Sequence, residues 1–556
     1  MTIGTGPALA RSAHVDTFAR DHLPPAKAWP ELVFDLPGLQ YPTRLNCAFE
    51  LLDAVIDRLG ADRPCLLTPH GEAWNYGKTR DVVDRVAHVL VGELGVVPGN
   101  RVLLRGPNNP WLVACWLAVQ KAGAVAVTTM PMLRESELTA IAGIARVDLA
   151  LCDARFVTDL FAAELHGAPV VPYGADTPGD LTQRIAGVSG PFAAVDTAAD
   201  DVALLAFTSG TTGQPKATMH FHRDLLAIAD TFSRHIVQPV AEDVFAGTPP
   251  LAFTFGLGGL VVFPLRVGAA TLLIETATPD ELADVIERNA VSVCFTAPTA
   301  YRAMVRGGRT SSLRTLRRAV SAGEHLPAAT WEAVHDAIGL KIIDGIGTTE
   351  MLHVFISAAD DDIRPGATGL PVPGYTACVL DEQGRPVPPG TPGRLAVKGP
   401  TGCRYLADPR QATYVQDGWN LTGDTFIQDE DGYLHYQARN DDMIVSSGYN
   451  IAGPEVEEAL LGHDAVAEVC VVGVPDTQRG QLVKAYVVLR DGHGASPQLG
   501  EELQQFVKAR IAPYKYPRAV QFVASLPRSA TGKVQHFLLR QQASVTGDLA
   551  ADARQE

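Results

Sequence analysis

The sequence predicts an α/β protein, with a large N-terminal domain of sheets flanked by helices and a small α+β C-terminal domain. Short apolar runs such as VALLAF (202–207) are followed by a loop and a helical stretch, which is the order found in parallel sheets. After residue 440 the pattern changes to a compact set of helices and strands of about 110 residues, long enough for a separate domain. We therefore expect domains over 1–440 and 441–556.

Three apolar runs define the expected N-terminal strands. VALLAF leads into a loop rich in Gly and Thr, and a helix over 223–235 is expected next, because it places four apolar side chains on one face: Leu225, Leu226, Ala229 and Phe232. VSVCF (291–295) precedes another helical stretch, and LKIID (340–344) precedes GIGTTE. The C-terminal set is expected to run as helix PEVEEALLGH, strand VAEVCVVGV, strand LVKAYVVL, helix LGEELQQFVKARI and strand AVQFVA.

The composition excludes several classes of function. The chain has 556 residues and a formal net charge of -16, without a long run of Lys or Arg, so we expect no nucleic-acid partner. The eight cysteines form no CxxC pair, which indicates reduced thiols rather than a zinc site and fits a cytoplasmic protein. The N-terminus lacks a signal-peptide pattern and WLVACWLAV is too short to span a membrane, so no membrane insertion is expected.

The segment TSGTTGQPK (208–216) combines hydroxyls, glycines and one lysine, as a site for a polyphosphate would. A Walker loop needs Gly, four residues and then Gly-Lys-Ser/Thr, and the residues from Gly210 to Lys216 do not follow that spacing. A P-loop nucleotide hydrolase is therefore excluded by motif. From these residues alone, two hypotheses stay open: a flexible turn with a solvated lysine, or a phosphate cradle of another family.

Four further segments follow in order: IDGIGTTE (343–350), WNLTGDTF (419–426), RNDDMIVSSGYNI (439–451) and LPRSATGKVQ (526–535). Each alone is weak evidence, because a Gly turn or a surface acid explains it. Together with TSGTTGQPK they resemble the motifs of the adenylate-forming superfamily, which contains acyl-CoA synthetases, luciferases and peptide-synthetase adenylation domains. The resemblance covers nearly the whole chain, from His14 to Arg540.

This resemblance implies roles for the motif residues and implies ATP, Mg²⁺ and coenzyme A as cofactors. Lys533, Thr349 and Glu350 would be catalytic, with Thr349 at the α-phosphate and Glu350 holding Mg²⁺. The small domain would be mobile, turning about a hinge at Asp441 and presenting Ser447, Gly448 and Tyr449 to coenzyme A. ATP or AMP would contact Thr208, Ser209, Gly210, Thr211, Thr212, Gly213, Lys216, Gly323, Glu324, Asp344, Gly345, Ile346, Gly347, Thr348, Asp424 and Arg439.

The reaction of the family explains why these residue types are needed. The carboxylate of an acid attacks the α-phosphate of ATP and expels pyrophosphate, and the thiolate of coenzyme A then attacks the acyl carbonyl and releases AMP. Both partners in the first step are anions, so bringing them together away from water requires cations. Mg²⁺ on Glu350 and the ammonium of Lys533 are the expected sources of that charge. A carboxylate at Asp424 suits ribose, because it can accept hydrogen bonds from both hydroxyls.

Longer segments resemble benzoate and 2-aminobenzoate (anthranilate) CoA ligases: KATMHFHRD (216–224), TPPLAFTFGLGG (248–259) and DGIGTTEMLHVFIS (344–357). The resemblance implies an aromatic carboxylate as substrate, in a pocket formed by Thr254, Phe255, Gly256, Gly323, Ile346, Gly347 and His353. Phe255 and Ile346 would sandwich the ring, whose burial contributes roughly 2–3 kcal/mol. His353 is either a polar contact to the substrate or a buried core histidine.

Three positions depart from the family pattern. Ile346 stands where many members place an aromatic residue against adenine, Asn450 where a basic residue is common, and His536 where Arg is frequent. Three hypotheses stay open. The first is an aryl-acid CoA ligase, a monomer or homodimer acting on 2-aminobenzoate, or alternatively on benzoate or hydroxybenzoate (salicylate). The second is a stand-alone adenylation enzyme that loads a carrier protein, and the third is an inactive nucleotide-binding homologue.

Overall fold

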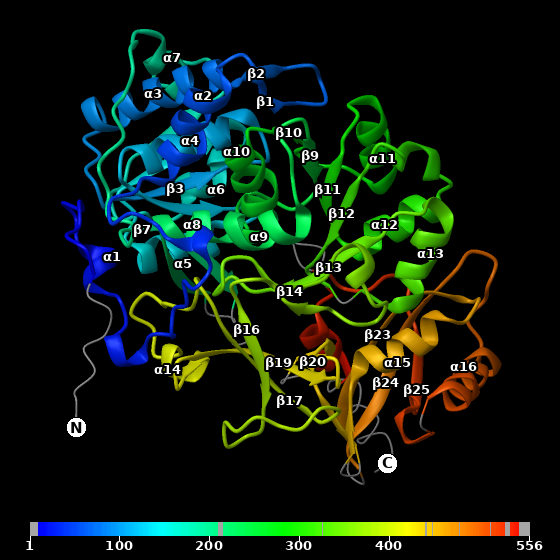
Figure 1. The fold of residues 1–556 in the computed structure, drawn as a ribbon. Helices are drawn as coiled ribbons and strands as arrows, with labels where there is room; N and C mark the ends of the chain where they lie inside the picture. Colours follow the sequence, from blue (N-terminus) through cyan, green and yellow to red (C-terminus); the bar gives the residue numbers. More distant parts are fainter. Residues whose placement is uncertain are drawn as a thin grey trace, which may run out of the picture.

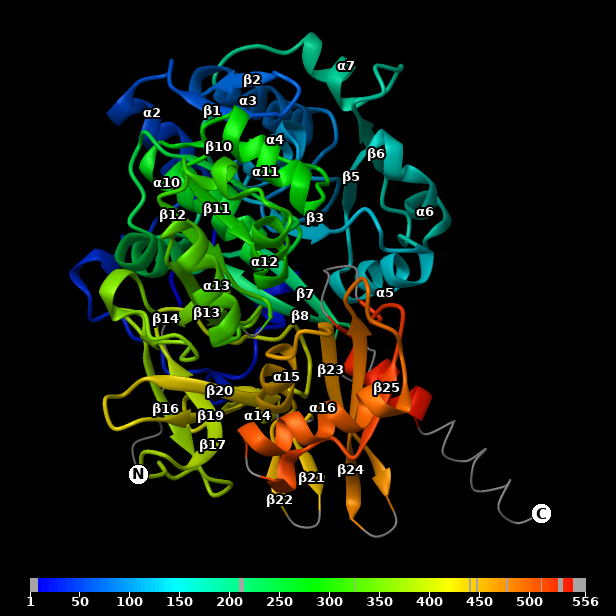
Figure 2. The ribbon, with the colours of Figure 1, turned by 90° about the vertical axis from the view of Figure 1, so that its right-hand side faces the viewer.

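The computed structural model describes residues 9–209, 215–324, 326–439, 442–446, 449–476, 479–511, 513–528 and 534–543. These residues form four sheets with helices packed around them (Figures 1 and 2). Three of the sheets lie in the N-terminal part and the fourth lies in the smaller C-terminal part, coloured orange to red in Figure 1. The predicted fold class is confirmed, while the boundary at residue 440 stays a prediction.

A six-stranded sheet ends in the two strands that flank residues 210–214. Its order is β6-β5-β3-β4-β7-β8, and all neighbours are parallel except β7 and β8. The strands are β3 (Arg101–Arg105), β4 (Val125–Thr129), β5 (Leu149–Asp153), β6 (Val170–Tyr173), β7 (Val202–Ser209) and β8 (Pro215–Phe221). Among the helices that contact it are α4 (Pro110–Lys121), α5 (Glu135–Ala145), α6 (Val157–Ala162) and α7 (Leu181–Ala186). Helix α3 (Tyr76–Gly92) packs on α4 and α7 and contacts two strands of a second sheet, β1 (Pro64–Leu67) and β2 (Ala73–Asn75).

The expectation that the Gly/Thr loop leads straight into a helix is wrong. Strand β8 intervenes and pairs antiparallel with β7, so that Thr208 faces Lys216 across the hairpin. The physical reason is a period of two in the sequence, since Ala217, Met219 and Phe221 enter a buried core while the alternate residues face the other way. The expected helix then follows as α8 (His222–Ile228) and a π-helical stretch, η5 (Ala229–Val237).

A nine-stranded sheet holds the DGIGTTE segment near one edge, in the order β15-β14-β13-β12-β11-β9-β10-β1-β2. Its strands are β1 (Pro64–Leu67), β2 (Ala73–Asn75), β9 (Val244–Gly247), β10 (Ala270–Leu273), β11 (Val293–Thr296), β12 (Arg318–Ser321), β13 (Ile342–Gly347), β14 (Val354–Ser357) and β15 (Leu370–Pro371). Its helices are α9 (Thr254–Leu257), η6 (Gly258–Val262), α10 (Phe263–Val267), α11 (Pro279–Arg288), α12 (Pro298–Arg306) and α13 (Ala328–Ile338).

Two five-stranded sheets complete the fold. The first has the order β16-β17-β19-β18, with β20 beside β19, and the second has the order β22-β21-β24-β23, with β25 beside β24. The first contains β16 (Thr376–Leu380), β17 (Pro392–Lys398), β18 (Val415–Gln416), β19 (Trp419–Gln428) and β20 (Leu434–Arg439), with helix α14 (Gln411–Tyr414). The second contains β21 (Ile444–Ser446), β22 (Tyr449–Ile451), β23 (Val466–Asp476), β24 (Gly480–Leu489) and β25 (Ala519–Phe522), with helices α15 (Gly453–Leu461) and α16 (Pro497–Arg510).

The large core lies between the two biggest sheets, and helix α4 shows how the sequence builds it. Pro110 occupies the first turn, and Asn109 caps the helix by accepting a 2.9 Å hydrogen bond from the Leu112 backbone. Nearly every residue of α4 is buried, including Lys121, whose ammonium lies 2.6 Å from Asp84. The apolar WLVACWLAV run is therefore a core helix. No helix in the described part of the chain is both long and apolar enough to cross a membrane.

The C-terminal part packs against the N-terminal part through α15, which contacts β20 and α13 (Figure 1). Glu458 on α15 accepts a 3.1 Å hydrogen bond from the backbone of Ala328 at the start of α13. Arg528 reaches across to Glu324 at 3.3 Å. These contacts place one face of the smaller part beside the segment that follows β12.

Candidate active site

The β7–β8 hairpin carries one side of the site. Lys216, Thr218 and His220 alternate along β8 and so share one face of the strand. That face is directed toward the turn after β13, because Lys216 contacts Glu350 and His220 contacts the backbone of Thr349. Two motifs that lie more than a hundred residues apart in the sequence therefore meet, as the resemblance implies.

Lys216, Glu350 and Tyr405 form a compact cluster at the centre of the site. The Lys216 ammonium lies 2.9 Å from Glu350 Oε1, and the Tyr405 hydroxyl donates a 2.5 Å hydrogen bond to the same oxygen. Lys216 also contacts the Tyr405 hydroxyl directly. Glu350 is buried, and burial alone would raise its pKa. The Lys216 charge and the hydrogen bonds from Tyr405 and Lys216 outweigh burial and lower the pKa, so Glu350 is a carboxylate at neutral pH.

Thr348 and Thr349, which precede Glu350, form hydrogen bonds with residues of other elements. The Thr348 hydroxyl lies 2.9 Å from the Tyr414 hydroxyl and accepts a 3.2 Å hydrogen bond from the Met351 backbone. The Thr349 carbonyl lies 2.8 Å from Nε2 of His220. Burial raises the pKa of Tyr414, and the charges of Glu350 and Asp424 raise it further. Tyr414 thus stands close to both the Glu350 cluster and Asp424.

Asp424 and Arg439 face each other on neighbouring strands β19 and β20. Their side chains lie 3.4 Å apart, with Asp424 buried and Arg439 more exposed. The structure therefore brings together Asp424, which the resemblance assigns to the ribose, and Arg439, which it assigns to ATP or AMP. An acceptor carboxylate held by an exposed guanidinium can receive hydrogen bonds from a diol while keeping its charge.

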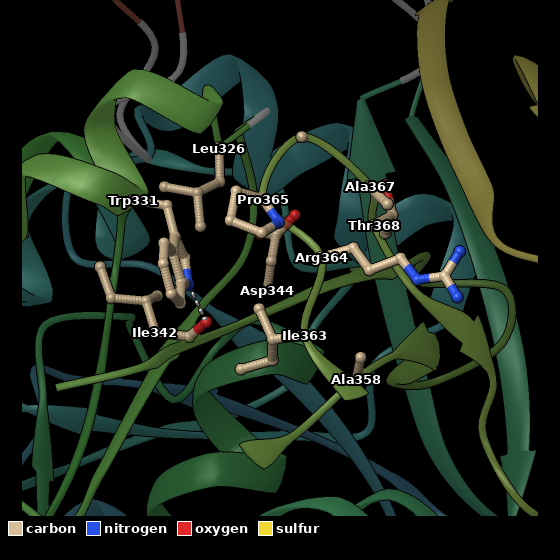
Figure 3. A pocket seen from close by; sticks show the side chains of 11 residues that line it. Leu326, Trp331, Ile342, Asp344, Ala358, Ile363, Arg364, Pro365, Ala367 and Thr368 are labelled. Carbon is tan, nitrogen blue, oxygen red and sulfur yellow. Dashed lines mark hydrogen bonds between the residues drawn. The ribbon is translucent and has the colours of Figure 1, made fainter. Parts of the chain in front are cut away.

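Asp344 begins the DGIGTTE segment in a different environment. Figure 3 shows it among Trp331, Pro365 and Ile363, which line a small pocket. Its Oδ1 is enclosed and has no hydrogen-bond partner among the described residues. Burial raises the pKa of Asp344 to about 8, against a smaller opposing effect of the Gly345 backbone. Asp344 is therefore protonated at neutral pH and can donate a hydrogen bond.

Glycines and Ile346 shape the wall next to Asp344. Ile346 pairs with Ile356 of β14, and a side chain at Gly347 would come within 2.6 Å of the His353 carbonyl. Gly323 has φ +93°, a conformation that side chains rarely adopt, and it precedes Glu324, which pairs with Arg528. A side chain would therefore be strained at Gly323 and would meet the backbone of His353 at Gly347.

Two of the predicted aryl-pocket residues, Phe255 and His353, belong to an aromatic cluster. Thr254, Phe255 and Gly256 start helix α9, and a side chain at Gly256 would come within 2.2 Å of the Pro250 carbonyl. The His353 ring lies 5.5 Å from the Phe255 ring, measured between centroids. It also lies 5.3 Å from Phe232 and 4.6 Å from Phe263.

The electrostatic state of His353 follows from its burial. Burial lowers its pKa to about 3, against a weaker opposing effect of the Phe255 backbone, so the ring is neutral. Neither ring nitrogen has a hydrogen bond of normal geometry with the described residues. A neutral imidazole offers one donor and one acceptor, and among the described residues its nitrogens have at most a poorly aligned contact with the Phe255 backbone.

Several predicted site residues lie outside the described residues: Gly210, Thr211, Thr212, Gly213, Asp441, Ser447, Gly448 and Lys533. The side chains of Ser209 and Tyr449 are also outside that description. Their roles stay predictions. For the predicted phosphate loop, the hinge and the coenzyme A segment, the structure therefore describes only the neighbouring strands.

The sequence reasoning missed three residues that contact the motifs. Tyr405 and Tyr414 belong to the stretch before WNLTGDTF, and His220 lies within KATMHFHRD. The alternation of β8 could have placed His220 on the same face as Lys216. The two tyrosines gave no sequence signal, because their partners lie 55 or more residues away.

A family model described as "AMP-binding enzyme" matches residues 52–405, and one described as "AMP-binding enzyme C-terminal domain" matches residues 455–533. The chain belongs to the AMP-binding enzyme family. It is 34% identical to a benzoate–CoA ligase of Thauera aromatica, over 91% of this chain and 97% of that protein. It is 33% identical to a 3-hydroxybenzoate–CoA ligase of Aromatoleum sp. (strain CIB), over 89% of this chain and 97% of that protein.

A solved structure of an anthranilate CoA ligase, in complex with anthranoyl-AMP, has a TM-score of 0.86 with this chain. The two are 30% identical, and the match covers 92% of this chain and all of the other. The predicted resemblance to the adenylate-forming superfamily, close to benzoate and anthranilate CoA ligases, is confirmed. This member of the AMP-binding enzyme family is an acid–thiol ligase.

Proposed function

We propose that this chain is an ATP-dependent aryl-acid CoA ligase that acts on 2-aminobenzoate through an acyl-AMP intermediate. The first half-reaction releases pyrophosphate, and the second forms the CoA thioester and releases AMP. The relatives named for benzoate and 3-hydroxybenzoate support an aromatic acid as the substrate. The solved anthranilate CoA ligase supports the amino-substituted acid. A cytoplasmic location, and a monomer or homodimer, stay predictions.

The residues around Glu350 fit the proposed cofactors. A buried carboxylate with a lowered pKa is the type of oxygen ligand that Mg²⁺ prefers, and Mg²⁺, when bound, neutralises charge on the phosphates of ATP. Lys216 stands at the end of the Gly/Thr segment, where its ammonium adds positive charge beside the same carboxylate. Thr349 is fixed through its carbonyl, and Asp424 with Arg439 suits the ribose.

One observation carries the choice of substrate: the neutral His353 lies among three phenylalanine rings, and neither of its nitrogens has a hydrogen bond of normal geometry with the described residues. Benzoate has no group on its ring that could bind an imidazole, so His353 would stay unpaired at a cost of about 1–3 kcal/mol. The amino group of 2-aminobenzoate can donate to the acceptor nitrogen. A site built for such a hydrogen bond can prefer its substrate by about 10⁴-fold, whereas an apolar pocket discriminates about 10–200-fold per methylene.

The experiment is a panel of aryl carboxylates in ATP–pyrophosphate exchange, followed by capture with coenzyme A or a phosphopantetheinylated carrier protein. We expect the highest kcat/KM for 2-aminobenzoate, and transfer to coenzyme A. His353→Phe should lower kcat/KM for 2-aminobenzoate by at least about tenfold while changing benzoate little, because only the substituent loses a partner. Phe263→Leu is the control, since it alters the packing of the same ring and should affect both acids alike.

The other outcomes separate the alternatives. A kcat/KM for benzoate or a hydroxybenzoate above that for 2-aminobenzoate would select those alternative substrates. Capture only by the carrier protein would select the stand-alone adenylation enzyme. Absence of exchange with every acid would contradict both enzymatic proposals and leave the inactive homologue.

A further inference from the structure

We propose that His220 is a positioning residue that holds the Thr349–Glu350 turn in its working orientation through the Thr349 carbonyl. This inference rests on the proposed roles of Thr349 and Glu350 in the first half-reaction. It assigns to His220 a function that the motifs themselves do not name. Three observations carry it: the face that His220 shares with Lys216, the geometry of its hydrogen bond, and the buried charges behind it.

The first observation is that one strand face holds two successive residues of the turn. Lys216 contacts the Glu350 carboxylate, and His220, four residues further along β8, contacts the Thr349 carbonyl at 2.8 Å. Side chains two positions apart on a strand share a face and form a rigid row. The strand therefore fixes the side chain of one turn residue and the backbone of its neighbour with respect to each other.

The second observation concerns the direction of the hydrogen bond. A carbonyl oxygen only accepts, so Nε2 of His220 carries the proton and donates it to Thr349. The side chain is fully buried, and burial followed by the charge of Arg404 lowers its pKa to about 3. His220 is therefore a neutral donor, which orders the turn without adding charge beneath the phosphate site.

The third observation is the buried segment packed behind the imidazole, where Nδ1 of His220 has no hydrogen-bond partner among the described residues. Asp224 lies 3.9 Å from Nδ1 of His220, and Arg404 forms an ion pair with Asp224, with all three side chains fully buried. Arg404 also accepts a backbone hydrogen bond at its carbonyl from Met219, the residue before His220. Because Arg404 precedes Tyr405, the same segment pairs with β8 beside His220 and contacts the Glu350 carboxylate.

Loss of the donor would leave the Thr349 carbonyl with only its 3.2 Å backbone hydrogen bond from Leu352, and the turn would be held less firmly. The expected defect is specific, because only steps that use Thr349 and Glu350 depend on that orientation. Binding of Mg²⁺·ATP and pyrophosphate exchange should weaken, while formation of the thioester from supplied acyl-AMP should change much less. A role in stability alone would lower the melting temperature without this selectivity.

The test compares variants by the Mg²⁺ concentration that gives half of the ATP-dependent rise in melting temperature, measured without acid or coenzyme A. His220→Phe removes the donor at similar volume, and we expect this concentration to rise at least about tenfold. His220→Gln keeps an N–H donor and should restore the value to within about threefold. His220→Met provides a second donor-free variant if the phenylalanine protein does not fold.

Thr218→Val is the matched control. Thr218 lies between Lys216 and His220 on the same face and is buried, and its hydroxyl has no hydrogen-bond partner among the described residues. Its replacement should leave the Mg²⁺ dependence unchanged. Glu350→Gln tests the premise, because an unchanged Mg²⁺ dependence in that variant would refute the proposed role of Glu350. A changed dependence in Glu350→Gln, with an unchanged one in the donor-free His220 variants, would overturn the inference alone.

Discussion

Glu350 and Asp344 lie six residues apart on the DGIGTTE segment, and their surroundings move the two pKa values in opposite directions. Both carboxyl groups experience burial, which raises the pKa. Around Glu350, the ammonium of Lys216 and the hydroxyl of Tyr405 outweigh that effect and lower the pKa. Around Asp344, only the Gly345 backbone opposes burial, and the pKa rises to about 8.

The comparison shows that burial does not by itself decide the charge of an acid in this site. The charge state depends on the neighbouring groups. The Lys216 ammonium on β8 contacts Glu350, whereas the pocket around Asp344 is lined mainly by apolar side chains. At Glu350 the segment carries a negative charge that can bind a cation. At Asp344 it carries a neutral carboxyl group that can donate a hydrogen bond. Substitutions that remove these neighbouring groups should bring the pKa values of the two acids closer together.

Lys216→Met should have the largest effect, because it leaves Glu350 buried without its cation. We expect ATP–pyrophosphate exchange to fall at least about 100-fold, since preorganised charge at such a site is worth that much. The pKa of Glu350 should rise, so the acid limb of the remaining activity should move to higher pH. Stability at pH 7 should fall by about 3 kcal/mol, the loss expected for one partner of a buried pair.

The control for this prediction is Lys398→Met. Lys398 pairs with Glu31, whose side chain is mostly exposed, so its loss should cost at most about 1 kcal/mol. Unfolding by urea at pH 7 and the pH profile of exchange measure both effects. An unchanged acid limb in Lys216→Met would mean that Lys216 does not set the pKa of Glu350.

Tyr405→Phe should have an intermediate effect. It removes the 2.5 Å hydrogen bond to Glu350 but leaves the Lys216 charge in place. A hydrogen bond to a charged group contributes about 1.5–3 kcal/mol, so the Mg²⁺ concentration for half-maximal exchange should rise about tenfold or more. Tyr301→Phe removes a buried hydroxyl that donates to the Cys294 carbonyl and should change stability but not the Mg²⁺ dependence. Equal Mg²⁺ dependence in the two variants would contradict the role of Tyr405.

The fold was predictable from the sequence where apolar runs are continuous. VALLAF and LKIID are strands, and the C-terminal order of helices and strands agrees with the structure. Strand β8 was missed because Lys216, Thr218 and His220 are polar residues on a buried face. Their partners, Glu350 and the Thr349 carbonyl, come from a distant segment, so a polar residue here looks like part of a loop.

The same reason limits what the sequence can say of the site. Motif order was enough to nominate Lys216, Thr349, Glu350 and Asp424 as site residues, because each stands in a local pattern, and their roles stay predictions. Tyr405 stands in no such pattern, and its role depends on contacts formed only in the folded chain. The opposite charge states of Asp344 and Glu350 were equally hidden, because a pKa depends on surroundings that the local sequence does not record.

Asp344→Asn should have the smallest effect on the first half-reaction, and its main effect should be on the pH dependence of stability. A folded pKa of about 8 lies above the unfolded value, so the folded protein holds an extra proton between those values and loses stability as pH rises through that range. Asn cannot ionise, so the variant should gain up to about 4 kcal/mol over the wild type at pH 8.5 relative to pH 4.5, because each pKa unit corresponds to about 1.4 kcal/mol. Urea unfolding at the two pH values measures this difference. Asp361→Asn, at an exposed acid whose pKa is lowered by Lys341, should show no such gain, and a gain of equal size there would contradict the burial of Asp344 as the cause.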